Sequence, residues 1–199
     1  MLTTIVSLVV ALGAQSLVVL YPPVFVFWFV FHIRIDHWRT MGKRAYWYAC
    51  LGWPVISLPL LLLRGWIFRV QWRMPWWVVA LGLIAAVNAV RVGGEAARVI
   101  SRRTLLGLVE LEPERNPQPV MQTGIYSRTR NPVYLTHVLL IFAAAAISGY
   151  AANCLLFGMD LLLISVLIRC EEKELIARYG GEYQDYMRRV PRLVPRWPW

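Results

Sequence analysis

Five long apolar runs limit what this chain can fold into. The first, from Leu2 to Phe31, contains no charged residue, and the runs at 45–63, 75–90, 133–150 and 151–168 are nearly as apolar. Each is close to the roughly 20 residues that a helix needs to cross a hydrocarbon layer ~30 Å thick. With 58% hydrophobic and 16% charged residues, the chain also differs from ordinary soluble domains. The sequence therefore predicts an all-α integral membrane bundle with about five transmembrane helices.

The first run is longer than one straight crossing requires, and it contains Pro22 and Pro23. The part that follows the prolines, Val24 to Phe31, is too short to cross alone. We therefore expect one kinked or tilted helix, with a hairpin that re-enters the same face as the alternative. Because no positive charge precedes the run, we expect no cleaved signal peptide.

Positive charge is distributed unevenly along the chain, whose formal net charge is +10. With five spans, all of the 21 Lys and Arg residues except Arg64, Arg69 and Arg73 fall in the segments 32–44, 91–132 and 169–199, which share one side of the membrane. The positive-inside rule then predicts an outside N-terminus and a cytoplasmic C-terminus. The basic residues are expected to meet membrane lipids and their anionic head groups, and no nucleic acid.

Cysteine and histidine positions point to neither a disulfide framework nor a metal centre. Cys50, Cys154 and Cys170 lie within or at the ends of spans, without C-x-x-C spacing. His32 and His37 flank a helix end, and the remaining histidine is isolated in the fourth span. We expect no metal.

We expect a single membrane domain over residues 1–199, divided into four segments. These are three N-terminal spans (1–92), a cytosolic interfacial segment (93–132), a helical hairpin (133–168) and a cytosolic tail (169–199). The interfacial segment is expected to hold a helix from Glu95 to Leu108. The tight hairpin brings "RTRNPVY" and "RCEEKE" to the same membrane face, so two distant polar clusters should lie side by side.

The tail should continue the fifth span as a helix and stop at Gly180 and Gly181. On that helix Glu172 shares an otherwise apolar stripe with Leu175, Ile176 and Tyr179. A buried carboxylate needs a partner. The candidates are Arg128, Arg130, Arg188, Arg189 and Arg192, although these arginines could instead extend toward lipid phosphates.

A second stripe of the same helix holds Glu171, Glu174 and Arg178, and we expect it to be solvated, with an ion pair between Glu174 and Arg178. Beyond the two glycines, "EYQDYMRRVPRLVP" predicts a short helix that places Tyr183 near Tyr186. The proline-bounded segment after it is suited to folding back as a lid.

These motifs resemble the isoprenylcysteine carboxyl methyltransferase family and its phospholipid N-methyltransferase relatives. "GIYSRTRNPVYLTHVLL" carries the R-x-x-R-H/N-P-x-Y pattern, and "CEEKELIARYGGEYQDYMRRVPRLVP" carries the E-E pair, G-x-x-Y-x-x-Y and x-P-R-x-x-P elements, over residues 124–195. The resemblance implies an integral membrane enzyme that uses S-adenosylmethionine in a pocket built from the C-terminal region. The absence of G-x-G-x-x-G agrees with a fold other than the soluble Rossmann type.

The resemblance also assigns roles. It makes Glu172, Arg192 and Tyr183 the expected catalytic residues, and it implies that the cofactor is bound by Gly124, Tyr126, Arg130, Asn131, Tyr134, Glu171, Glu172 and Tyr186. The prenylcysteine enzymes usually have His where this chain has Asn131, and Asn is familiar in the phospholipid-type relatives. The acceptor therefore stays open.

Methyl transfer from a sulfonium requires mainly alignment of the reacting atoms, at about 3–3.5 Å. A carboxylate acceptor needs no base, whereas an amine, phenol or thiol must lose a proton to a tyrosine, Glu171 or His137. His137 and Asp160 are candidates for the substrate cavity, since acidic residues inside a membrane are rare and often functional. Asp160 could equally bond to Asn153, His137 or a serine within the bundle.

The favoured function is methyl transfer to a lipid-like or prenylated acceptor, similar to isoprenylcysteine O-methylation. Phospholipid N-methylation and thiol S-methylation are the alternatives within that class. A sterol-reductase-like enzyme using NADPH would need more spans than 199 residues provide. A non-catalytic membrane scaffold is the third possibility, and the sequence does not determine the oligomeric state.

Overall fold

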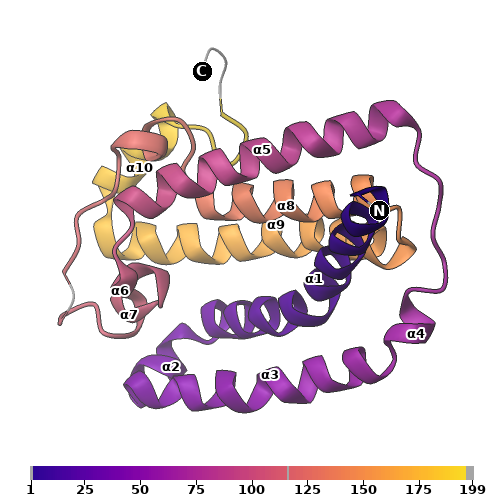
Figure 1. Cartoon of the computed structure of the whole chain (residues 1–199). Helices are drawn as coiled ribbons and strands as arrows, with labels where there is room; N and C mark the ends of the chain where they lie inside the picture. Colours follow the sequence, from indigo (N-terminus) through magenta and orange to yellow (C-terminus); the bar gives the residue numbers. More distant parts are fainter. Residues whose placement is uncertain (1, 116, 196–199) are drawn as a thin grey trace.

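The computed structural model describes residues 2–115 and 117–195, which form a bundle of helices (Figure 1). These residues contain no strand, only an isolated bridge between Gln71 and Tyr150. The elements are α1 (Leu2–Ile33), α2 (Ile35–Met41), the 3-10 helix η1 (Gly42–Arg44), α3 (Ala45–Leu62), α4 (Arg64–Ile67), α5 (Trp76–Val99), α6 (Arg102–Leu105), α7 (Leu108–Leu111), the 3-10 helix η2 (Gly124–Ser127), α8 (Pro132–Ser148), α9 (Ala151–Tyr179) and α10 (Gly181–Arg189). The all-α prediction is confirmed.

Each predicted apolar run has its helix, but the helices differ in length. Among the described residues, α1, α5 and α9 are long and apolar enough to cross a membrane, and α2 with α3 adds a fourth candidate as a bent pair. Helix α8 has 17 residues, about 25 Å at 1.5 Å per residue, so it is shorter than a full crossing. The chain is a multi-pass integral membrane protein, and the residues that the structure describes hold three or four candidate spans instead of five.

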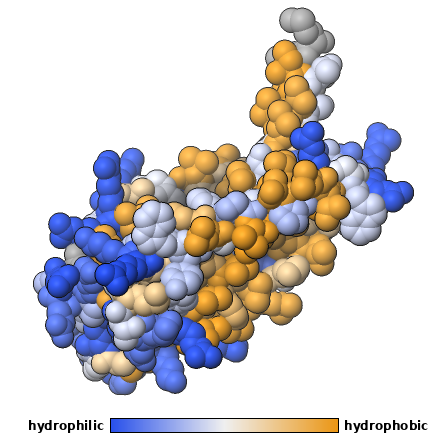
Figure 2. Space-filling view, turned by 90° about the horizontal axis from the view of Figure 1, so that it is seen from below, coloured by the Kyte–Doolittle hydropathy of each residue, from blue (hydrophilic) through white to orange (hydrophobic). Residues whose placement is uncertain are grey.

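The outer surface of the bundle fits a lipid environment. Figure 2 shows hydrophobic residues over a broad part of one face, with the largest group of hydrophilic residues at one end. Exposed side chains such as Leu62, Trp76, Val90 and Leu162 would be costly to expose to water in a soluble protein. They are expected to contact lipid.

Helix α1 resolves the choice between a kinked helix and a hairpin. It runs without interruption from Leu2 to Ile33 and holds Pro22 and Pro23 inside it. Figure 1 shows that its path bends partway along its length. A proline removes one backbone donor and crowds the preceding turn, which bends a helix without reversing it. The one-helix prediction is confirmed.

Helices α5 and α8 pack closely because α5 presents small residues to α8. A Cβ atom built on Gly82 would lie 2.9 Å from the Cβ of Ala146, and one on Gly93 would lie 3.1 Å from Cγ2 of Thr136. The buried Ala85 and Ala89 of α5 lie between these two glycines. Small residues at such spacing let two membrane helices approach until their backbones nearly touch.

The expected interfacial helix from Glu95 to Leu108 is wrong. Helix α5 continues through Gly93 to Val99, because Val92 and Ala96 on either side of the glycine are buried and their packing stabilises the helix. Ile100 is extended, and Ser101 then caps α6 by accepting a hydrogen bond from the Thr104 backbone N–H. Two one-turn helices, α6 and α7, replace the predicted single helix.

Candidate functional site

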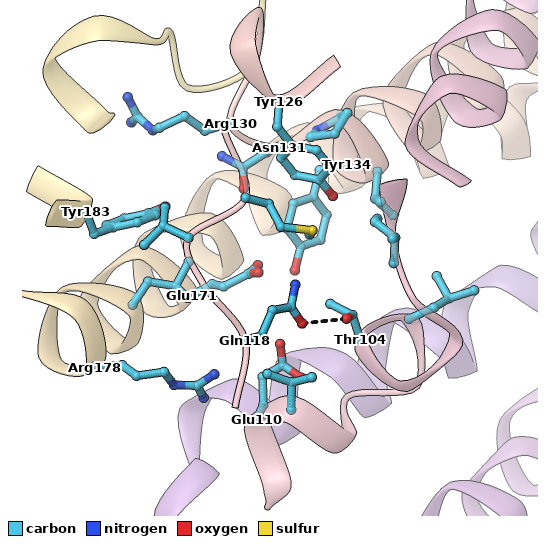
Figure 3. A pocket seen from close by; sticks show the side chains of 18 of the residues that line it. Thr104, Glu110, Gln118, Tyr126, Arg130, Asn131, Tyr134, Glu171, Arg178 and Tyr183 are labelled. Carbon is cyan, nitrogen blue, oxygen red and sulfur yellow. Dashed lines mark hydrogen bonds between the residues drawn. The ribbon is translucent and has the colours of Figure 1, made fainter. Parts of the chain in front are cut away.

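A cavity of about 320 Å³ lies where the charged end of α9 meets α7, the start of α8 and the tail. Helix α1 closes one wall with Val24, Trp28 and His32, which follow one another at helical spacing. The loop at 118–121 and helix α10 contribute the remaining sides. Figure 3 shows polar side chains from these separate elements pointing toward one space.

Two carboxylates face this cavity without full hydrogen bonding. Glu110 comes from α7 and Glu171 from α9, and in the described part of the chain Oε2 of each is buried with no hydrogen-bond partner. The Tyr134 hydroxyl donates to Glu171. Burial, followed by the charge of Glu171, raises the pKa of Glu110 to about 7. Buried acids of like charge are unfavourable alone, so this pair is suited to a cationic ligand.

Further polar groups surround the acidic pair. Gln118 accepts a hydrogen bond from Thr104 Oγ1 at 2.8 Å, and its backbone carbonyl accepts one from the Tyr179 hydroxyl at 2.8 Å. Figure 3 shows the amide nitrogen of Gln118 directed into the cavity. Arg178 also lines the cavity, and its Nη2 pairs with Glu174 Oε1 at 2.5 Å. The predicted ion pair between Glu174 and Arg178 is confirmed.

Glu172 has the cationic partners that the sequence predicted. Its Oε1 accepts from Arg130 Nε at 3.1 Å and from Arg130 Nη2 at 2.6 Å, while Oε2 pairs with Arg192 Nη2 at 2.7 Å. The side chains of Glu172 and Arg130 are only 4% and 6% exposed. Since arginines engage both oxygens and Glu172 does not line the cavity, Glu172 is placed to hold the tail.

The tail is bound back onto the start of α8 by hydrogen bonds to its backbone carbonyls. Thr129 Oγ1 donates to Leu193 O at 2.8 Å, and Asn131 Nδ2 donates to Arg192 O at 2.8 Å. Arg130 contributes its backbone N–H to Pro191 O at 3.0 Å. The "RTRNP" motif and the proline-bounded segment therefore form one unit, as the fold-back prediction requires.

Helix α10 completes the side of the cavity next to the tail. The Tyr186 hydroxyl donates to Tyr126 O at 2.6 Å, and the rings of Tyr183 and Tyr186 lie 5.8 Å apart. The predicted proximity of these two tyrosines is confirmed. Helix α9 ends at Tyr179 before Gly180, whose φ of +57° favours glycine, as the sequence predicted.

The structure brings together most of the predicted site residues. Those that line the cavity are Tyr126, Arg130, Asn131, Tyr134, His137, Glu171, Tyr183 and Tyr186. Gly124, Glu172, Arg192 and Asp160 do not line it. The Tyr21 hydroxyl donates a hydrogen bond to Asp160 Oδ1 at 2.8 Å. Among the described residues, Asp160 therefore bonds to Tyr21 and to none of the partners expected from the sequence.

Two features of the site differ from the sequence expectation. The stripe of Glu171, Glu174 and Arg178 is not solvated, because Glu174 and Arg178 are only 10% and 16% exposed and Glu171 faces the cavity. Glu110, which lines the cavity, is not among the site residues predicted from the sequence. It stands in a polar segment rich in glutamate, but only the tertiary fold places it beside Glu171.

Known proteins support a methyltransferase relationship. The family model described as phospholipid methyltransferase matches residues 77–182, about half of the chain. Methanethiol S-methyltransferase 2 of Bradyrhizobium diazoefficiens is 42% identical over 73 residues, which cover 36% of this chain and 27% of that protein. The methanethiol S-methyltransferase of Mycobacterium tuberculosis is 30% identical over 106 residues, covering 50% and 42%.

A relative with a different printed activity also matches. The protein-S-isoprenylcysteine O-methyltransferase of Schizosaccharomyces pombe is 30% identical over 87 residues, covering 43% of this chain and 37% of that protein. The chain thus matches less than half of the length of each of these three relatives. No solved structure matches the chain.

Proposed function

Because the chain belongs to the phospholipid methyltransferase family, we propose that it is a membrane enzyme that transfers a methyl group from S-adenosylmethionine to an apolar acceptor. The observation that carries this proposal is the pair of buried carboxylate oxygens, on Glu110 and Glu171, that face the cavity without a partner in the described residues. Such a pair suits a small polar cation. The methionine ammonium group and the sulfonium of the cofactor both supply positive charge.

The residues of the cavity fit the rest of the cofactor as well. Arg178 lines the cavity, and its guanidinium can pair with the methionine carboxylate in a fork geometry. Apolar side chains such as Met121 and Leu175 lie around the polar groups and can contact the adenine ring. When bound, the cofactor supplies an electrophilic methyl group that needs no further activation.

The protein contributes alignment and exclusion of water. Tyr183 and Tyr186 of α10 line the cavity at its polar side, while Val24 and Trp28 of α1 form an apolar wall at the other. An apolar acceptor can reach the methyl group from the membrane along that wall, and the polar cofactor can enter from the cytoplasm. Holding both reactants in line is worth up to roughly 7–11 kcal/mol of barrier reduction. The Lys and Arg residues concentrated in segments 91–132 and 169–199, which both contribute to this cavity, support the cytoplasmic placement of this opening.

One candidate acceptor is lipid-like or prenylated and is methylated on a carboxylate oxygen. The named isoprenylcysteine relative and the apolar wall support it. A thiol acceptor is the second candidate, and the higher identity to a protein named methanethiol S-methyltransferase favours it.

Calorimetric titration with S-adenosylhomocysteine tests the cofactor proposal on detergent-purified protein. We expect Glu171→Gln to weaken binding at least tenfold, about 1.4 kcal/mol, since it removes charge beside the ligand ammonium. Glu114→Gln is the matched control, because Glu114 is an exposed acid outside the cavity. Folded wild-type protein that binds NADPH but no S-adenosylhomocysteine would contradict the proposal and support the reductase alternative.

A further inference from the structure

His137 lines the cavity from α8, and no hydrogen bond within the described residues uses its ring nitrogens. It lies on α8, about 9 Å further along the helix than Asn131 at a rise of 1.5 Å per residue. It lines the cavity, and in the described part of the chain its contacts are aromatic rings, with no hydrogen bond to either nitrogen. An imidazole with this surrounding can bond to a ligand in the cavity.

Two tyrosine rings make edge-to-face contacts with the imidazole ring of His137. The ring of Tyr21, from α1, lies 5.5 Å from that of His137 at an interplanar angle of 85°. The ring of Tyr134, from α8 itself, lies 6.5 Å away at 80°. Edge-to-face contacts of this kind favour one ring orientation. The orientation of His137 is thus set from two sides without use of its nitrogens.

Each tyrosine is in turn bonded to a carboxyl group of α9. Tyr21 donates to Asp160 Oδ1 at 2.8 Å, and Tyr134 donates to Glu171. The titratable groups that face His137 are therefore two tyrosines from α1 and α8, with two acids of α9 behind them. The two acidic groups thus lie behind the tyrosines, and each is hydrogen-bonded to a tyrosine hydroxyl.

Resting on the proposed methyl transfer, we infer that His137 is the group that accepts the proton of the acceptor, and that the acceptor is a thiol. The sulfur lone pair forms a bond to the methyl carbon as the bond from that carbon to the sulfonium breaks. The electron pair of the broken bond stays on the cofactor sulfur, which becomes a neutral thioether. The thiol proton moves to a ring nitrogen of His137.

The neighbouring groups are less suited to this role. The hydroxyls of Tyr21 and Tyr134 already donate to carboxyl groups, and Glu171 and Glu110 face the place proposed for the ligand cation. A carboxylate acceptor is already ionised near neutral pH, so it has no proton to lose and needs no base. Histidine is the residue whose ordinary pKa suits proton acceptance at that pH.

The test compares His137→Gln with wild type, using methanethiol as one acceptor and N-acetyl-S-farnesylcysteine as the other, with methyl-labelled S-adenosylmethionine. We expect the variant to methylate methanethiol at least 100-fold more slowly at pH 7, in line with general-base contributions of about 10²–10⁴. The deficit should shrink as the pH rises and the thiol ionises in solution. Thr136→Val is the control, because Thr136 lies next to His137 on α8 but faces Gly93 of α5.

Chemical modification gives a readout independent of turnover. Diethylpyrocarbonate should modify His137 in the free protein, and S-adenosylhomocysteine with methanethiol should protect it, while the exposed His37 reacts in both states. Peptide mass spectrometry distinguishes the histidines. Binding of S-adenosylhomocysteine by the variant confirms that it is folded.

The outcomes separate the two proposals. Wild type that binds S-adenosylhomocysteine but does not methylate methanethiol overturns the role of His137 and leaves the cofactor proposal standing. The role of His137 is also overturned if His137→Gln methylates methanethiol at a rate within threefold of wild type at pH 7, a difference on the order of 0.6 kcal/mol. It is likewise overturned if the rate deficit of the variant does not change with pH. Folded wild type without affinity for S-adenosylhomocysteine overturns the methyltransferase proposal itself.

Discussion

The neighbouring acids Glu171 and Glu172 should respond to mutation in different ways. Replacing Glu172 by Gln removes the charge that both Arg130 and Arg192 contact. Because Arg130 is 6% exposed, its guanidinium would stay buried without a counter-charge, and breaking such a pair typically costs 3–5 kcal/mol. The amide oxygen can still accept one hydrogen bond, so we expect about 3 kcal/mol, the lower end of that range.

A loss of this size is measurable by thermal unfolding in detergent. For a chain of this length 1 kcal/mol shifts Tm by roughly 2–4 °C, so Glu172→Gln should lower Tm by roughly 6–12 °C. The tail should also become sensitive to trypsin after Arg188 and Arg189, since Glu172 connects it to Arg130. Arg192→Gln is the milder control, because Arg192 is 45% exposed and its pair should contribute at most about 1 kcal/mol.

Two results would refute this reasoning. The first is a Tm unchanged within roughly 2 °C together with a tail as resistant as in wild type. The second is loss of S-adenosylhomocysteine binding in Glu172→Gln without any loss of stability, which would mean that Glu172 contacts the cofactor.

The remaining predictions concern the cavity and the helix contacts. The pKa of Glu110 is raised from 4.5 to about 7, so its stabilising contribution is present below about pH 4.5 and is lost as the pH rises through about 7. Glu110→Gln should therefore be the more stable protein above pH 7, by on the order of 1–3 kcal/mol, and a pH series of thermal melts checks this. Ligand binding should depend on pH in the opposite way, because the ammonium group of the ligand favours ionised Glu110. The affinity for S-adenosylhomocysteine should fall from pH 8 to pH 6 in wild type and change less in Glu110→Gln. If calorimetry shows the same pH dependence of affinity for both proteins, Glu110 is excluded from the site. Gly82→Ala should lower stability by about 1–3 kcal/mol, because its Cβ would lie 2.9 Å from Ala146, whereas Gly158→Ala, with nothing within 4 Å, should be neutral or stabilising in the same melts. Tyr186→Phe should cost about 1 kcal/mol through the lost bond to Tyr126 O, and an unchanged Tm would contradict that bond.

Much of the fold follows from local pattern. Apolar runs place the main helices, and Gly180 ends α9 because its backbone conformation favours a residue without a side chain. The need of a buried acid for a cation correctly predicted that Glu172 would pair with arginine, and Arg130 and Arg192 are two of the five candidates. These features depend on short-range geometry or on a strong energetic requirement, so the sequence alone reveals them.

The candidate site was decided by tertiary packing. Glu171 and Glu172 are consecutive on one helix, about 100° apart around its axis. Only the positions of α7 and α1 make Glu171 face a cavity, while Glu172 contacts Arg192 of the tail. The same packing brings Glu110 beside Glu171. It also buries Glu174 and Arg178, which the helical spacing predicted to be solvated. Helix α5 likewise continues through Gly93 because Val92 and Ala96 are buried in one cluster with Leu135 of α8. The sequence by itself determined where the main apolar helices lie and which acid needs a partner, whereas the tertiary structure decided which faces meet, since that depends on contacts between distant elements.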